Sequence, residues 1–162
     1  MIKGLHHAAY RCRDSEETRQ FYEDFLGLPL VEAFEITQTQ TGRDTNVLHS
    51  FFQMDDGSCL AFFEAPGRPF DFKEQHDFDL HIALEVDTDT LHRMFEAGKA
   101  AGVETRGIAD HGFIHSIYFR DPNGYVIELT APVEGAGDYA AEAAGKAHAA
   151  LAQWQETKPT AG

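Results

Sequence analysis

The chain of 162 residues has few basic residues and no long apolar segment. Thirteen lysines and arginines face 27 aspartates and glutamates, and a net charge of −14 leaves no basic stripe to neutralise phosphates. We therefore expect no nucleic-acid partner. No stretch approaches the roughly 20 apolar residues that cross a bilayer, and the opening MIKGLHHAAY does not read as a signal peptide. We expect no membrane partner and a cytoplasmic location.

Cysteine is also scarce. Cys12 and Cys59 form neither a CxxC pair nor a disulfide framework, which favours reduced thiols that fill small apolar spaces on strands. The length suits one domain, or two small packed halves, with room for a core.

An internal repeat organises the chain. At an offset of 74 residues, LHHAAYRCRDSEETRQFYEDFLGL is similar to DLHIALEVDTDTLHRMFEAGKAAGV. Each copy predicts an alternating strand, a capping residue, an amphipathic helix and a terminal glycine. Asp14 or Ser15 is expected to cap the first helix, and Thr88 or Asp89 the second.

The closing strands repeat as well, because DDGSCLAFFEAP matches DPNGYVIELTAP in its turn and its final Ala-Pro. Each half has room for two further strands, at 30–36 and 46–54 in the first and at 104–108 and 115–120 in the second. Each half is then a βαβββ module, too small to bury its own sheet face, so the two must pack together. The fold class predicted is α+β: two paired modules, at about 1–68 and 78–132, within one domain of residues 1–132.

Strand parity separates the two adjacent histidines of GLHHAAYRCRD. In DLHIALEVD the apolar face formed by Leu80 and its alternate residues must pack on the helix, which turns His81 toward the concave side. The repeat aligns His7 with His81. His7 is therefore the functional candidate, and His6 points the opposite way.

The last strand adds an acid on the concave face. Glu128 stands between apolar residues of GYVIELTAP, an unusual setting for a carboxylate on a strand. A three-residue loop at Pro122-Asn123-Gly124 pairs Asp121 with Tyr125 and sets Tyr118 opposite Glu128. His115 then falls on the other face unless a bulge intervenes. Two imidazoles and one carboxylate on one face suit a divalent metal with open positions.

The segments LHHAAYRCRD, FYEDFLGL, DLHIALEVD and SIYFRDPNGYVIELTAP resemble those of the vicinal oxygen chelate superfamily, which includes glyoxalase I, bleomycin-resistance proteins and type I extradiol dioxygenases. The resemblance covers about residues 3–132. It implies a cupped mixed sheet around a metal, often with homodimerisation, and metal ligands at His7, His81 and Glu128.

The family branches at a fourth ligand position, which here falls on Ala61 or Phe62. Neither side chain can bind a metal, and Glu64 reaches only from a bulged strand. A three-ligand site leaves about three positions of an octahedral ion open, as extradiol cleavage of a catechol by Fe(II) and O₂ requires. Mn(II), Ni(II) or Zn(II) are alternative ions.

Catalytic residues are implied by the same resemblance. Tyr118 matches a tyrosine that hydrogen-bonds the substrate in extradiol enzymes. A proton carrier is also expected, and His111, His115 and His76 are available, with His111 best placed to lean over the cleft.

Two other functions stay open. One is metal-dependent chemistry of the glyoxalase, epimerase or thiol-transferase kind on the same residues. Ligation of the metal by Glu64 would favour this function. The other is metal-free sequestration of a small molecule, against which the three candidate ligands argue.

Residues 133–162 form an Ala-rich extension outside the resemblance. A stripe that includes Tyr139, Leu151 and Trp154 predicts a helix, with Asp138 as a candidate cap. We expect Tyr139 and Trp154 to dock on this domain or on a partner subunit, or the helix to act as a lid over the cleft.

Overall fold

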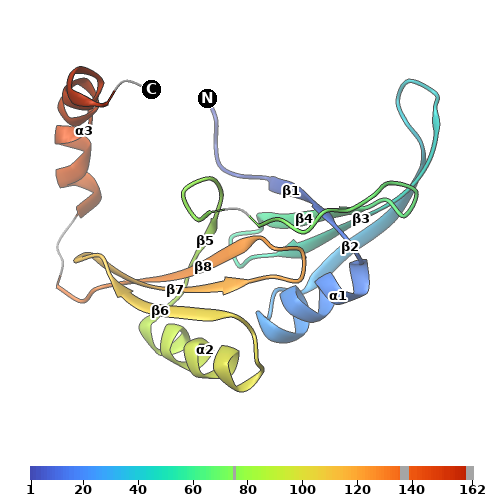
Figure 1. Cartoon of the computed structure of the whole chain (residues 1–162), viewed down its shortest axis with the longest axis horizontal. Helices are drawn as coiled ribbons and strands as arrows, with labels where there is room; N and C mark the ends of the chain where they lie inside the picture. The colour runs from blue at the N-terminus through green and yellow to red at the C-terminus, as the bar shows by residue number, and fades with distance from the viewer. Residues whose placement is uncertain (75, 136–138, 160–162) are drawn as a thin grey trace.

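The computed structural model describes residues 1–74, 76–135 and 139–159, and it contains the two predicted βαβββ modules (Figure 1). The first module consists of β1 (His7–Cys12), α1 (Ser15–Arg19), the π-helix η1 (Gln20–Phe25), β2 (Leu30–Gln38), β3 (Asp44–Gln53) and β4 (Cys59–Glu64). The second consists of β5 (Ile82–Glu85), α2 (Thr88–Ala100), β6 (Thr105–Asp110), β7 (Ile114–Arg120) and β8 (Val126–Pro132), and α3 (Tyr139–Thr157) follows it. All four predicted inner strands form, with ends shifted by at most two residues.

Each module makes a four-stranded mixed sheet with the same topology. The first sheet has the order β1-β4-β3-β2 and the second has the order β5-β8-β7-β6. The pairs β1-β4 and β5-β8 are parallel, and all other neighbouring strands in the two sheets are antiparallel. The repeat seen in the sequence is therefore a structural repeat.

The helix caps confirm one prediction and correct another. Asp14 caps α1 by accepting a hydrogen bond from the backbone N–H of Glu17. The cap of α2 is Asp87, which accepts from Thr90 N at 2.6 Å, so the choice of Thr88 or Asp89 was wrong. Asp87 has the extended backbone that a capping residue needs, whereas residues 88 and 89 already lie inside the helix.

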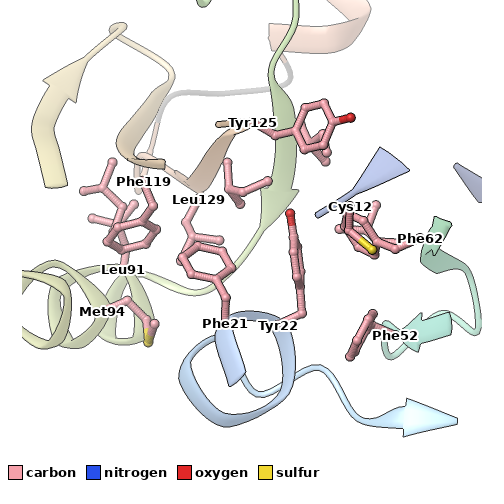
Figure 2. Close-up of a cluster of buried hydrophobic side chains, with 14 of the residues drawn as sticks. Cys12, Phe21, Tyr22, Phe52, Phe62, Leu91, Met94, Phe119, Tyr125 and Leu129 are labelled. Carbon is pink, nitrogen blue, oxygen red and sulfur yellow. The ribbon is translucent and has the colours of Figure 1, made fainter. Parts of the chain in front are cut away.

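One hydrophobic core joins the modules (Figure 2). Tyr22 of η1 is fully buried and donates a hydrogen bond to Asp121, which follows β7 in the second module. The ring of Phe25 contacts Phe119 at 5.2 Å between centroids. The modules thus pack through their helix-bearing sides, which leaves the opposite face of each sheet open to a ligand.

The turn before β8 has the predicted register. Asp121 N donates to Tyr125 O, and Tyr118 is the direct partner of Glu128. Gly124 has a φ of +96°, and a Cβ there would lie 2.5 Å from the backbone of Lys73, so only glycine fits.

The C-terminal helix stands at the far end of the second sheet in Figure 1. Tyr139 stacks on Phe113 at 3.6 Å between ring centroids, as expected for docking on this domain. Trp154 is 58% exposed and makes no such contact with the described residues. Asp138, the expected cap, lies outside the described residues. No helix in the described part of the chain is both long and apolar enough to span a membrane.

Candidate active site

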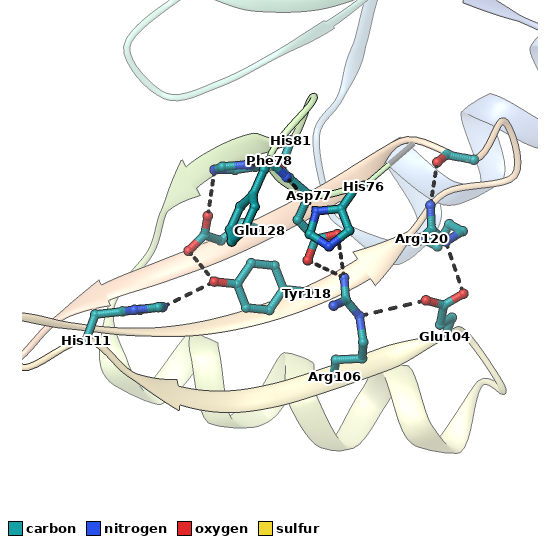
Figure 3. Close-up of polar contacts among 11 residues, drawn as sticks. His76, Asp77, Phe78, His81, Glu104, Arg106, His111, Tyr118, Arg120 and Glu128 are labelled. Atoms are coloured by element: carbon teal, nitrogen blue, oxygen red, sulfur yellow. Dashed lines mark hydrogen bonds and ion pairs between the residues drawn. The ribbon is translucent and has the colours of Figure 1, made fainter. Parts of the chain in front are cut away.

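Four of the predicted site residues do meet, on the open face of the second sheet (Figure 3). His81 Nε2 lies 3.2 Å from Glu128 Oε2, and Tyr118 donates to Glu128 Oε1 at 3.2 Å. His111 Nε2 lies 3.2 Å from the Tyr118 hydroxyl oxygen. Because the one Tyr118 proton goes to Glu128, the His111 nitrogen is the donor in this chain of hydrogen bonds.

The local fold explains why these side chains converge. Tyr118 and Glu128 are direct partners on β7 and β8, and Ala83 pairs with Glu128 on the other side. His81 comes two residues before Ala83, directly before β5 begins, and so lies on the same face. Glu128 is only 6% exposed and has no arginine or lysine partner among the described contacts.

Burial and the neighbouring Glu128 charge raise the pKa of Tyr118 above its usual value. The phenol therefore keeps its proton at neutral pH and acts as a hydrogen-bond donor.

The donor set fits a divalent metal ion. His81 Nδ1 lies 2.7 Å from the backbone oxygen of Asp77, and since a carbonyl can only accept, Nδ1 carries the proton. When Nε2 carries no proton, its lone pair and the Glu128 carboxylate oxygen 3.2 Å away can bind the same cation. Two ligands at about 2.1 Å from one ion and at right angles lie about 3.0 Å apart, close to this spacing.

A pocket of about 430 Å³ opens over these groups. Besides the four residues above, its lining consists of Asp77, Phe78, Phe113 and Ile114. Among the described residues that line it, none is a lysine or an arginine. The pocket offers an apolar wall beside a cluster of oxygen and nitrogen ligands.

His7 lies elsewhere. It sits on the open face of the first sheet, 5.4 Å from the ring of Phe51 and 6.2 Å from that of His49. Within the described part of the chain, no three His, Cys, Asp or Glu side chains come together as a metal-binding group. A single chain therefore does not assemble the predicted triad.

His6 does not face the packed side as expected, because its Nδ1 lies 2.8 Å from His7 Nδ1 in an exposed position.

His49 was not among the predicted site residues. This side chain is 6% exposed, stacks on Phe63 at 3.8 Å, and has its Nδ1 3.0 Å from the Phe62 carbonyl oxygen. Its Nδ1 must therefore donate, which leaves Nε2 as an acceptor. The sequence contains a pattern that could have identified His49. In DTNVLHSFFQ, alternation places His49 on the same face as Phe51, and in the structure this face also carries His7.

The register resolves the fourth ligand position. Ala9 pairs with Ala61 in the first sheet, as Ala83 pairs with Glu128 in the second, so Ala61 is the equivalent of Glu128. Glu64 is occupied elsewhere, since its Oε2 accepts from the backbone N–H of Ser15 at 2.7 Å. Neither residue supplies a fourth ligand in this arrangement.

The remaining predicted proton carriers lie away from the pocket. His115 is three residues before Tyr118 and faces the other side of β7, with its Nε2 3.8 Å from Asp110. His76 lies before β5, where its Nδ1 accepts from Phe78 N at 3.2 Å.

Comparison with known proteins identifies the family of this chain. Residues 4–129 match the family model described as the Glyoxalase/Bleomycin resistance protein/Dioxygenase superfamily. The chain is 29% identical over 141 residues to the "Putative ring-cleaving dioxygenase MhqA" of Bacillus subtilis (strain 168), with 84% of this chain and 42% of that protein covered. It is also 29% identical over 140 residues to the metallothiol transferase FosB of Shouchella clausii (strain KSM-K16), with 80% of each covered.

Solved structures of the same fold include two that are informative. The fosfomycin resistance protein FosX of Listeria monocytogenes, in complex with Mn(II) and sulfate, matches with a TM-score of 0.61 and 23% identity, covering 83% of this chain and 96% of that one. A mutant of that FosX was crystallised with Mn(II) and a dihydroxypropylphosphonic acid. A glyoxylase/bleomycin resistance protein/dioxygenase domain from Frankia sp. EAN1pec matches with a TM-score of 0.65 and 18% identity, covering 83% and 96%.

Proposed function

This chain belongs to the Glyoxalase/Bleomycin resistance protein/Dioxygenase superfamily, and from that premise we propose that it is a ring-cleaving dioxygenase that uses Fe(II) and O₂ on a catechol-like substrate. The observation that carries the proposal is the pair His81 Nε2 and Glu128 Oε2, 3.2 Å apart, at the floor of a pocket with Phe78 and Phe113 in its wall. An aromatic diol matches both features, because its ring is apolar and its two oxygens are adjacent.

We infer that His7 of a second copy completes the ligand set. The open face of the first sheet carries His7, and the open face of the second carries His81 and Glu128, so each face holds part of a site. A two-fold homodimer that sets the first sheet of one copy against the second sheet of the other forms two equal sites. Phe34, 42% exposed on the first face, would be covered by such an interface.

Two imidazoles and one carboxylate suit Fe(II), and the absence of a fourth ligand at Ala61 leaves positions for substrate and O₂. Mn(II), Ni(II) or Zn(II) could occupy the same donors. When bound, the ion supplies Lewis-acid polarisation of the substrate oxygens and, as Fe(II), electrons for O₂.

The protein's own groups move the protons. In the assembled site His49 lies beside His7, and its Nε2 accepts a proton from one substrate hydroxyl, because its Nδ1–H is held by the Phe62 carbonyl. Tyr118 donates its hydrogen bond to the carboxylate of Glu128, and its raised pKa keeps it protonated for that role. His111 donates to Tyr118 from behind and holds the phenol in place. The proposal gives no role to His115 or His76.

The likeness to FosB supports a second candidate, a thiol transferase on the same metal ligands, because it covers 80% of both chains. The ligand in the FosX mutant complex is a phosphonic acid, and an anion of that kind requires cationic side chains. The described lining of the second-sheet half of the site supplies none, which supports the aromatic diol on that half.

The test is oxygen uptake by protein reconstituted anaerobically with Fe(II) and offered a panel of catechols, with Glu128→Ala as the control. We expect uptake with formation of a yellow ring-cleaved product, and neither in the variant. Protein shown to carry one metal ion per chain that consumes no oxygen with any catechol would exclude the dioxygenase. Thiol addition to an electrophile by that same protein would establish the transferase in its place.

A further inference from the structure

Arg106 on β6 lies at the edge of the site and contacts Asp77 and the ring of Tyr118 (Figure 3). Its guanidinium binds both carboxylate oxygens of Asp77, at 3.0 and 2.8 Å. It also lies 5.3 Å from the centre of the Tyr118 ring, its direct partner on β7. The second carboxylate near it, Glu104, is more distant at 3.8 Å.

Asp77 matters because its backbone oxygen orients a metal-ligand candidate. That oxygen accepts from His81 Nδ1 at 2.7 Å, which fixes the ring so that Nε2 faces Glu128. A histidine ligand is held in this way by the partner of its other nitrogen, and loss of the partner weakens metal binding. The carbonyl can act so only if the peptide at Asp77 is itself held.

The segment around Asp77 belongs to no helix or strand. Two backbone bonds from Asp79 and Leu80 to the His76 oxygen form a local turn, at 2.8 and 3.3 Å. The ion pair with Arg106 attaches this turn to β6 of the second sheet, and Leu80 at the end of the turn packs against the core. Both partners reach solvent, with side chains 46% and 23% exposed, so the pair adds little to global stability.

We propose that Arg106 is a positioning residue: by holding Asp77 it fixes the carbonyl that orients His81, and by its contact with the Tyr118 ring it aligns the phenol with Glu128. This inference rests on the proposed function, since it concerns the same metal site. It adds a residue that touches neither the metal donors nor the substrate but sets how well the donors converge.

The first measurement is amide hydrogen exchange of residues 76–81 in the metal-free protein. We expect Arg106→Gln to speed exchange at Asp79 and Leu80 about tenfold, because the turn loses its attachment. Glu104→Gln is the matched control, since it removes the other carboxylate near Arg106 and spares Asp77. Unchanged exchange in Arg106→Gln, or an equal change in both variants, would overturn the inference.

The second measurement is the dissociation constant for Mn(II), by titration calorimetry. Arg106→Gln and Asp77→Asn should each weaken binding by about 10-fold, as loss of an orienting partner does, and Arg106→Lys should recover part of the loss. The double variant should be no weaker than either single one, because both remove the same ion pair. Faster exchange with an unaltered Mn(II) affinity would refute the orienting role.

The two proposals can fail separately. Wild-type protein that binds Mn(II) and cleaves catechols, with Arg106→Gln unaltered in both measurements, removes only the positioning role. Wild-type protein that binds no Mn(II), with exchange accelerated in Arg106→Gln, removes the metal function, and the orienting role of Arg106 with it, while the attachment of the turn stands.

Discussion

The two sheets share one topology, but their open faces differ in chemistry. The first face is aromatic, with Phe34, Phe51 and Phe63 around His49. The second is polar, with hydrogen bonds from His111 to Tyr118 and from Tyr118 to Glu128. Phe51 and Tyr118 are equivalent in register, as are Ala61 and Glu128.

The two sheets therefore share backbone topology and register, while the residues at their outward positions differ. The first face has apolar rings around His7 and His49, and the second has the carboxylate of Glu128 and the phenol of Tyr118 beside His81 and His111. Neither face alone offers three metal ligands within the described residues. The chemistry of the two faces therefore favours a site assembled from both.

The largest expected effect comes from two variants that each lack a metal ligand from a different sheet. His7→Ala and Glu128→Ala should each lose activity, because each removes a ligand from both sites of the dimer. After unfolding and refolding as an equal mixture, half of the dimers are mixed and one of their two sites is intact, so about one quarter of wild-type activity should return. Oxygen uptake before and after mixing measures this.

The control is the same mixing procedure with His81→Ala and Glu128→Ala, whose residues lie on one face. That pair should recover nothing, since every site keeps a defect. Recovery in the control, or none in the first mixture, would contradict a site shared between copies.

The next effect compares the proton-handling histidines of the two faces. We expect His49→Gln to lower kcat about 100-fold, because it removes the acceptor for the substrate proton. His111→Gln should lower kcat by about 10-fold, because His111 acts through Tyr118. Steady-state kinetics at a fixed, measured metal content check both values.

His115→Gln provides the reference, since His115 lies on the opposite side of β7 from Tyr118. Its kcat should stay within about twofold of wild type. A loss in this variant as large as in His49→Gln would argue against the assignment of the two faces.

The smallest effect concerns the packed side that the modules share. Tyr22→Phe removes a donor from the buried Asp121 and should lower the free energy of unfolding by about 1–3 kcal/mol at neutral pH. Burial raises the pKa of Asp121 above its ordinary value. The folded state therefore binds the proton more tightly than the unfolded one, and the contribution of Asp121 to stability falls as pH rises from the ordinary value through the raised one.

The loss in Tyr22→Phe should follow the same interval. It should be smallest where Asp121 is protonated in both states and reach its full size above the raised pKa, where the bond has a charged acceptor. Urea unfolding at a fixed protein concentration, from about pH 3 to about pH 8, measures this. An equal loss across the range would show that Asp121 does not change its protonation there.

Much of the fold and part of the site could be predicted because the patterns that carry them are local. Alternation along a strand fixes which side chains share a face, and the repeat carried that rule from His81 to His7. The Pro122-Asn123-Gly124 turn fixed the pairing of Tyr118 with Glu128, because turn geometry sets the register of a hairpin. The cap at Asp87 lay one residue outside the predicted choice, which is the scale at which helix ends escape a sequence pattern.

Which faces meet depended instead on contacts between distant parts of the chain. Pairs of residues about 100 positions apart, such as Tyr22 with Asp121, pack the modules through their helix-bearing sides and leave His7 and Glu128 on separate sheets. No periodicity reports such contacts, because side-chain alternation describes one strand at a time. The same reason applies to the contacts of Asp77. Its hydrogen bond with His81 and its ion pair with Arg106 depend on how the segment between the modules packs against the second sheet.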